Sequence, residues 1–267
     1  MSVELPTLEA LFETSDLPAF ELPEELLAAY GGPLGFERPR VVANFVTSLD
    51  GVVGLPGPGE SGGVVSGGSA ADRFVMGLLR ACADTVLVGA GTFRRTPNVK
   101  WTADAIFPAA SPFYAELRRS LGLPAEPRFV VVSASGDLDP RSPALSRALV
   151  ATTSAGAERL RPGLSPDAEL FVASGSSVPM TDLVPRLRGE GRGLVLAEGG
   201  PSLFAELVQG RLLDELFLTL SPALFGRFGG DGRKSLADGL DVRGARFDLL
   251  GLRREGSLLF TRYALEK

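Results

Sequence analysis

Two glycines between a short apolar run and a proline form the strongest chemical signal in the sequence. The run 194–197 leads into Glu198, Gly199 and Gly200, and Pro201 follows. Glycine lets the backbone approach a ligand closely, and the free N–H groups and dipole of a helix N-terminus attract a phosphate. A tight strand-to-helix turn without a ligand explains the same residues. The residues alone therefore leave both interpretations open.

A second glycine turn follows another apolar run, 86–88, and reads Gly89, Ala90, Gly91 and Thr92. It differs from the Rossmann dinucleotide fingerprint, because an arginine stands where that fingerprint has its third glycine. The carboxyl ends of parallel strands lie at one edge of a sheet, which is where open α/β sheets bind ligands. We therefore expect the two glycine turns to lie at the same edge, around one small-molecule site.

Hydroxyls and a carboxylate end a third apolar run, where Thr47, Ser48 and Asp50 precede a glycine. An Asp-Gly turn without any chemistry explains them equally well. The glycine-rich segment 52–68 that follows is interpreted either as a lid or as a surface loop. The segment 232–235 resembles the end of a P-loop, but its glycine and lysine are not adjacent, so we assign it no role.

Histidine is absent from the 267 residues, and cysteine occurs once, at Cys82. These counts exclude Ser-His-Asp and Cys-His nucleophilic sites and the zinc sites built from imidazole or thiolate, so we expect no metal. What remains is chemistry that a cofactor supplies, or that carboxylates, hydroxyls and backbone dipoles perform. The net charge of −5, with basic residues scattered along the chain, argues against a nucleic-acid surface.

The cellular setting follows from the same composition. No apolar stretch reaches the roughly 20 residues that a membrane span needs. The amino terminus is acidic where a secretory signal is basic. We therefore expect a cytoplasmic protein that acts on a small molecule and binds neither membrane nor nucleic acid.

Short apolar runs alternate with helical patterns after residue 40, and runs apolar throughout indicate a sheet with helices on both faces. The expected strands are 41–45, 85–88, 129–132, 149–152, 170–173, 194–197 and 216–220. Helices should begin at Ser69, Ser111 and Pro201. A hairpin of 247–250 and 258–263 should end the sheet. Residues 1–40 are interpreted as an arm packed on a single domain formed by residues 41–267.

Four motifs occur in order along the chain: 47–51, 79–92, 198–203 and 213–216. Together they make residues 40–265 resemble the pyrimidine reductases of riboflavin biosynthesis, the RibD C-terminal domain family. The resemblance implies a dihydrofolate-reductase-like fold, a three-layer α/β/α sandwich with a mostly parallel sheet, usually as a homodimer. It also implies hydride transfer from NADPH, which opens a ribosylamino sugar on a pyrimidine into a ribitylamino chain.

The resemblance also implies roles, carried over motif by motif. Ser48 and Asp50 would be catalytic, beside the nicotinamide, while Asn44, Ser66 and Arg80 would bind the substrate. Ser66 and Arg80 would do so through its phosphate, by charge-assisted hydrogen bonds. The residues implied to bind the cofactor are Thr47, Gly89, Ala90, Gly91, Thr92, Ser133, Glu198, Gly199, Gly200, Pro201, Ser202 and Leu203. Among them, Ser133 would contact the phosphate that distinguishes NADPH from NADH.

Two positions depart from the family pattern. Riboflavin-pathway members tend to have a lysine near Asn44, and an acidic pair where this chain has Arg94, Arg95 and Thr96. The cofactor half of the site therefore matches the family better than the substrate half. The leading hypothesis is an NADPH-dependent reductase of a ribosylaminopyrimidine-like substrate, and a dihydrofolate or pterin reductase is the second. A catalytically inactive nucleotide-binding protein is the alternative from another class.

Overall fold

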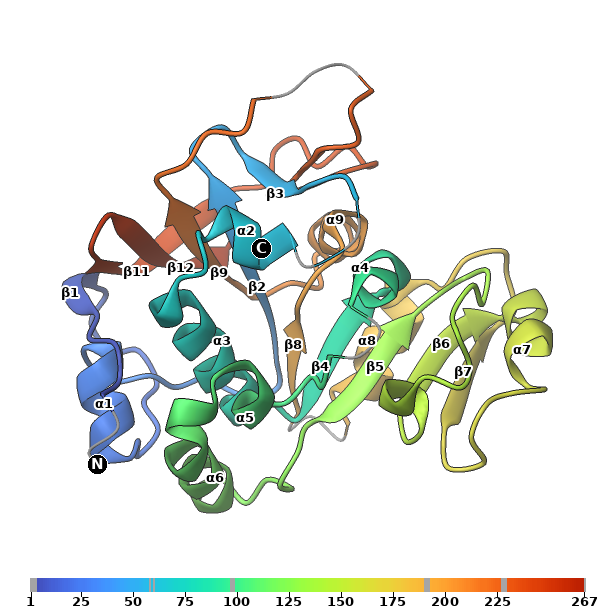
Figure 1. Ribbon diagram of the computed structural model, residues 1–267, viewed down its shortest axis with the longest axis horizontal. Helices are drawn as coiled ribbons and strands as arrows, with labels where there is room; N and C mark the ends of the chain where they lie inside the picture. Colours follow the sequence, from blue (N-terminus) through green and yellow to red (C-terminus); the bar gives the residue numbers. More distant parts are fainter. Residues whose placement is uncertain are drawn as a thin grey trace.

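The computed structural model describes residues 4–57, 59, 61–96, 99–189, 193–226 and 230–266. The first three residues of the arm, Pro58 and Glu60 of the glycine-rich segment, and Pro97 lie outside these ranges. Figure 1 shows the described chain as one twisted sheet flanked by helices. None of the described helices combines the length and the apolar character that crossing a bilayer requires.

Ten strands form the main sheet, in the order β1-β11-β12-β9-β2-β8-β4-β5-β6-β7. Its parallel part consists of β9 (Glu215–Ser221), β2 (Arg40–Ser48), β8 (Leu194–Ala197), β4 (Thr85–Gly89), β5 (Arg128–Val132), β6 (Leu149–Thr153) and β7 (Glu169–Ala173). Its antiparallel end consists of β12 (Leu258–Leu265), β11 (Phe247–Glu255) and β1 (Glu9–Glu13). The predicted α/β fold, a mostly parallel sheet with a C-terminal antiparallel hairpin, is confirmed.

Helices cover both faces of the parallel part, which explains why a strand such as β8 is buried along its whole length. One face packs against α1 (Glu24–Tyr30), α3 (Ala70–Cys82), α5 (Ala103–Ile106) and α6 (Ser111–Ser120). The other packs against α8 (Met180–Leu187) and α9 (Pro201–Gln209). The remaining helical elements are α2 (Ser61–Val65), α4 (Ala90–Arg95), α7 (Ser154–Leu160) and the short 3₁₀ turns Pro108–Ala110 and Pro143–Leu145.

Local sequence signals account for the positions at which three of the helices begin. The Ser69 hydroxyl accepts a hydrogen bond from the Asp72 amide at 3.1 Å and so caps α3. Prolines stand in the first turn of α6 and α9, where their missing N–H costs no hydrogen bond. The helices predicted to begin at Ser69, Ser111 and Pro201 are therefore present.

The N-terminal arm contributes a strand, which the sequence did not predict. β1 pairs with β11, and the buried Arg253 of β11 forms a salt bridge with Glu13 of the arm. The Arg253 guanidinium also lies 4.0 Å from the ring centroid of Tyr30, which ends α1. The arm thus extends the main sheet and covers one end of its core.

A small second sheet lies above the carboxyl ends of the parallel strands. β3 (Val52–Gly54) pairs with β10 (Lys234–Ser235) in antiparallel fashion. The segment that follows β3 leads into α2, so the described part of the glycine-rich segment is largely folded. This pairing holds Lys234, from the segment that resembles the end of a P-loop, opposite Gly54 of β3.

Candidate active site

A cavity of about 400 Å³ lies at the carboxyl ends of β2, β4 and β8. Both glycine turns line it, Gly89–Thr92 from β4 into α4 and Glu198–Leu203 from β8 into α9. The Gly89 amide donates a 3.4 Å hydrogen bond to the carbonyl oxygen of Gly199. The structure therefore brings together two turns that lie more than 100 residues apart in the sequence. Their predicted binding roles stay predictions.

The turn before α9 requires glycine at both positions. Gly199 and Gly200 have φ angles of 103° and 87°, in the region that L side chains rarely adopt. A β-carbon on Gly199 would lie 2.7 Å from the Thr92 hydroxyl oxygen. The amides of Ser202 and Leu203, in the first turn of α9, have no partner within the helix. This part of the cavity is therefore lined by backbone and rich in hydrogen-bond donors.

Arg80 lines the cavity, but its guanidinium is already engaged inside the protein. Its Nε donates a 2.7 Å hydrogen bond to the Glu198 carboxylate, and the two side chains are only 2% and 4% exposed. Another nitrogen donates to the carbonyl oxygen of Thr102, and the guanidinium lies 5.1 Å from the ring of Trp101. Arg80 and Glu198 thus form a neutral pair in the cavity wall. Arg80 as a ligand of a substrate phosphate stays a prediction.

Ser48 and Asp50 lie outside the lining of this cavity and stabilise the turn between β2 and β3. The Ser48 hydroxyl donates to Asp50 at 2.5 Å and accepts from the Val52 amide at 2.9 Å. The Asp50 carboxylate also accepts from the amides of Phe225 and Gly226. The hydrogen bond from Ser48, reinforced by these amides, holds the pKa of Asp50 below its ordinary value of 3.8. Their catalytic role stays a prediction.

Three other predicted residues also lie away from the main cavity. Thr47 is buried, and its hydroxyl donates to the carbonyl oxygen of Ser48. Ser66 lines a separate, smaller cavity beside the loop after β9. Ser133 is buried just after β5, and its hydroxyl has no partner among the described residues. The structure does not bring these three side chains to the glycine turns, and their roles stay predictions.

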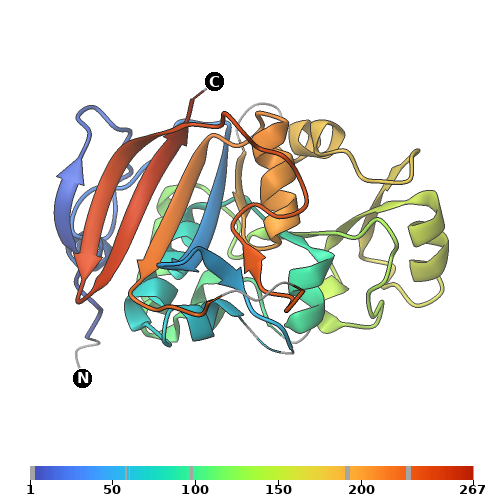
Figure 2. The same ribbon diagram turned by 90° about the horizontal axis from the view of Figure 1, so that it is seen from above.

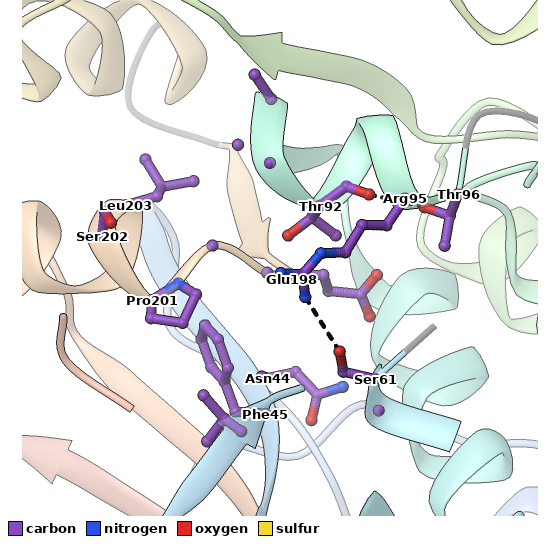
Figure 3. A pocket seen from close by; sticks show the side chains of 18 of the residues that line it. Asn44, Phe45, Ser61, Thr92, Arg95, Thr96, Glu198, Pro201, Ser202 and Leu203 are labelled. Atoms are coloured by element: carbon purple, nitrogen blue, oxygen red, sulfur yellow. Dashed lines mark hydrogen bonds between the residues drawn. The ribbon is translucent and has the colours of Figure 1, made fainter. Parts of the chain in front are cut away.

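Asn44 is the predicted substrate residue that does face the cavity freely. Its side chain is 9% exposed and makes no hydrogen bond to any other described residue. The carboxamide can therefore both donate to and accept from a ligand. Figure 3 shows it on the same side of the cavity as Ser61.

Several residues of the cavity wall were not among the predicted catalytic or binding residues. They include Ser61, Met76, Arg95, Thr96, Trp101, Ile106, Glu206 and Lys234. The Arg95 guanidinium donates a 3.1 Å hydrogen bond to the Ser61 hydroxyl, the dashed line in Figure 3. The Lys234 ammonium pairs with Asp238 at 2.9 Å, and burial raises the pKa of Glu206. Two signals in the sequence could have pointed to this wall: the departure from the family pattern at Arg95 and Thr96, and Trp101, the chain's single tryptophan.

The sequence profile of the RibD C-terminal domain matches residues 39–259 of this chain. The chain belongs to the RibD C-terminal domain family. Membership of the RibD C-terminal domain family classes the protein with the oxidoreductases and confirms the resemblance found in the sequence. No curated protein sequence matches the chain.

Solved structures of related RibD-type proteins share the fold. A pyrimidine reductase-like protein from Corynebacterium diphtheriae has a TM-score of 0.70 at 24% identity, over 86% of this chain and 92% of that one. RibD of Acinetobacter baumannii has a TM-score of 0.64 at 18% identity, over 86% of this chain but 59% of that longer one. The riboflavin biosynthesis reductase of Saccharomyces cerevisiae has a TM-score of 0.54 at 15% identity, over 86% of this chain and 90% of that one.

Proposed function

We propose that this protein is an NADPH-dependent reductase that transfers a hydride to a ribosylaminopyrimidine-like substrate. The observation that carries the proposal is the pair of glycine turns around the N-terminus of α9, which line the same cavity as Asn44 and Trp101. Membership of the RibD C-terminal domain family supports the same activity.

The residues present fit the phosphates of a dinucleotide. Gly200 has only the Leu203 side chain and the backbone of Gly89 within 4 Å of a β-carbon, and Gly91 has nothing. A ligand can therefore approach the backbone of both turns closely. The amides of Ser202 and Leu203 would donate to the pyrophosphate, because α9 does not use them and its dipole favours an anion there.

NADPH, when bound, supplies the hydride. For a ribosylamino substrate the hydride adds to C1 of the sugar, the bond from C1 to the ring oxygen breaks, and that oxygen takes up a proton. Asn44 would orient the substrate, because its free carboxamide faces the cavity. Trp101 and Met76 would exclude water from the reacting atoms, since both line the same wall.

A dihydropterin or dihydrofolate is a second candidate substrate. Val53, Met76, Trp101 and Ile106 line the cavity and offer an apolar surface to a flat bicyclic ring. The chain also has Asn44 where riboflavin-pathway members tend to have a lysine. An amide in place of a charge favours a neutral heterocycle at this position.

The test is an assay of purified protein with NADPH and a panel of pyrimidine ribosylamines and dihydropterins. We expect NADPH to be oxidised with one class and the reduced product to appear in equal amount. Nicotinamide fluorescence measures NADPH binding independently. Binding without turnover on either class would favour the inactive nucleotide-binding alternative, and absence of NADPH binding would contradict the proposal.

A further inference from the structure

Arg95 is a cation of the cavity wall that no carboxylate of the described residues neutralises. The structure gives it no salt bridge within the described part of the chain, and its one side-chain hydrogen bond joins it to Ser61. The other basic side chains of the cavity wall have acidic partners, since Arg80 pairs with Glu198 and Lys234 pairs with Asp238. A half-buried, uncompensated guanidinium presents a fork of donors that matches an oxyanion.

The Ser61 hydroxyl is oriented by its two neighbours. It accepts one hydrogen bond from the Leu55 amide and one from Arg95, both at 3.1 Å. A hydroxyl has two acceptor lone pairs and one proton to donate. Because both lone pairs are engaged, the proton of Ser61 remains available to an acceptor in the cavity. Arg95 and Ser61 together therefore present only donors.

Arg95 enters the cavity from the opposite end of the helix whose start contacts the turn proposed to hold the cofactor phosphates. Gly89 and Thr92, at the start of α4, contact the Gly199–Gly200 turn, whereas Arg95 ends the same helix. Six residues of helix separate Gly89 from Arg95, a rise of about 9 Å. Figure 3 shows Ser61 across the view from Pro201, Ser202 and Leu203, and the Arg95 side chain reaching from the end of α4 to meet it.

We propose that Arg95 and Ser61 form a binding subsite for an oxyanion of the substrate, a phosphate or a carboxylate. The substrate would then be a heterocycle with an acidic tail, whose ring lies against Trp101 and whose tail reaches Arg95 and Ser61. This inference rests on the proposed reductase function and names the side chains that would receive the substrate's anionic group. Arg95 and Ser61 are residues that the family resemblance did not assign to this task, while the role implied for Arg80 stays a separate prediction.

The chain's single tryptophan provides a direct readout, because Trp101 lines the cavity. Intrinsic fluorescence is titrated at constant ionic strength with ribose 5-phosphate, with ribonate and with neutral ribose. We expect the parent protein to bind at least one anion more tightly than ribose, and the tighter one distinguishes phosphate from carboxylate. Arg95→Ala should lose roughly tenfold to a hundredfold in affinity for that anion, as expected for a charged hydrogen-bond partner.

Matched variants separate this subsite from general charge effects. Arg94→Ala removes the same charge from the same helix, but Arg94 is exposed and faces Asp137, so anion affinity should not change. Ser61→Ala should weaken the anion to a smaller extent, and Arg95→Lys should retain part of the affinity. Circular dichroism serves as the folding control.

The outcomes that overturn the subsite differ from those that overturn the reductase function. The subsite is wrong if Arg95→Ala binds the anions like the parent, or if the parent prefers neither anion to ribose. It is also wrong if Arg95→Ala loses NADPH affinity while ribose 5-phosphate binding is unchanged, because Arg95 would then serve the cofactor. A parent protein that binds an anion through Arg95 but never binds NADPH would contradict the reductase function alone.

Discussion

Arg80 and Glu198 line the cavity as an ion pair whose side chains are 2% and 4% exposed. Removing one partner leaves the other charged and buried without compensation. We expect Arg80→Ala to lower the free energy of unfolding by about 3 to 5 kcal/mol, measured by chemical denaturation. Arg128→Ala breaks a solvent-exposed pair with Glu169 and should cost less than about 1 kcal/mol. Equal stability of Arg80→Ala and the parent would contradict the buried pairing.

Asp50 links pH to the stability of the turn after β2. Its pKa is lower in the folded protein than its ordinary value of 3.8, chiefly through the hydrogen bond from Ser48. A lowered carboxyl pKa stabilises the fold above the ordinary value, and this contribution disappears as the pH falls through the lowered pKa. We expect Asp50→Asn to melt at a lower temperature at neutral pH. Its melting temperature should also fall less than the parent's below pH 3.8. Parallel pH profiles would show that Asp50 does not stabilise the turn.

At the residue scale, the sequence could predict a turn where the backbone dictates the geometry, while the ligand-binding roles of its residues stay predictions. Gly199 and Gly200 were identifiable because their pattern between strand and helix signals a turn that approaches a ligand. Arg95 was visible in the sequence only as a departure from the family pattern, because its partner Ser61 lies 34 residues earlier and only the folded glycine-rich segment brings them together. For Ser48 and Asp50 the sequence indicated a turn as one of two interpretations. It could not show that the Asp50 carboxylate also accepts a hydrogen bond from the amide of Phe225, which is distant in the sequence.

At the scale of elements, the turn before α9 offers a sharp test of cofactor binding. Gly200→Asp places a β-carbon and a negative charge where the pyrophosphate is proposed to lie. We expect the variant to lose NADPH affinity by at least roughly a hundredfold, about 2.7 kcal/mol. Nicotinamide fluorescence measures the affinity, with circular dichroism as the folding control.

Gly200→Ala is the matched control, because Gly200 has a φ of 87° and any L residue is strained there. The alanine variant introduces the strain, of about 1 to 2 kcal/mol, without the charge. NADPH affinity should therefore fall much further in the aspartate variant. If Gly200→Asp folds and binds NADPH like the parent, the turn has a structural role alone.

The strands and helices of the parallel part could be predicted because each is apolar enough to be recognised without its neighbours. β8 is buried along its length, and α3 and α9 carry their own start signals. β1 and β10 could not be predicted, because they are short and depend on partners at the far end of the sequence. β1 pairs with β11, and β10 pairs with β3.

At the scale of the whole molecule, one face of the antiparallel end lacks a covering helix among the described residues (Figure 2). Phe12 pairs with Leu252 and Leu249 with Tyr263, so each pair shares a face of the sheet. Phe12 and Leu249 are 45% and 37% exposed. These residues present apolar surface that a second copy of the chain would bury.

The homodimer implied by the resemblance is therefore predicted to form through this face. Light scattering after gel filtration should give the mass of two chains for the parent, and Leu249→Lys should shift the protein toward the monomer. Leu240 is similarly exposed, at 38%, but lies outside the sheet, so Leu240→Lys should leave the mass unchanged. A parent protein with the mass of one chain would contradict the prediction.

The pairing of β1 with β11 also determines which strand forms this edge of the sheet. β1 is a short edge strand with a glutamate at each end, and both glutamates form salt bridges with arginines of β11. Short, charged edge strands discourage the addition of further strands, whereas a long unpaired edge acts as a template for them. A chain shortened to begin at Pro39, where the family match begins, would expose the nine-residue edge of β11. Such a fragment would be prone to aggregate edge to edge, even with its cavity intact.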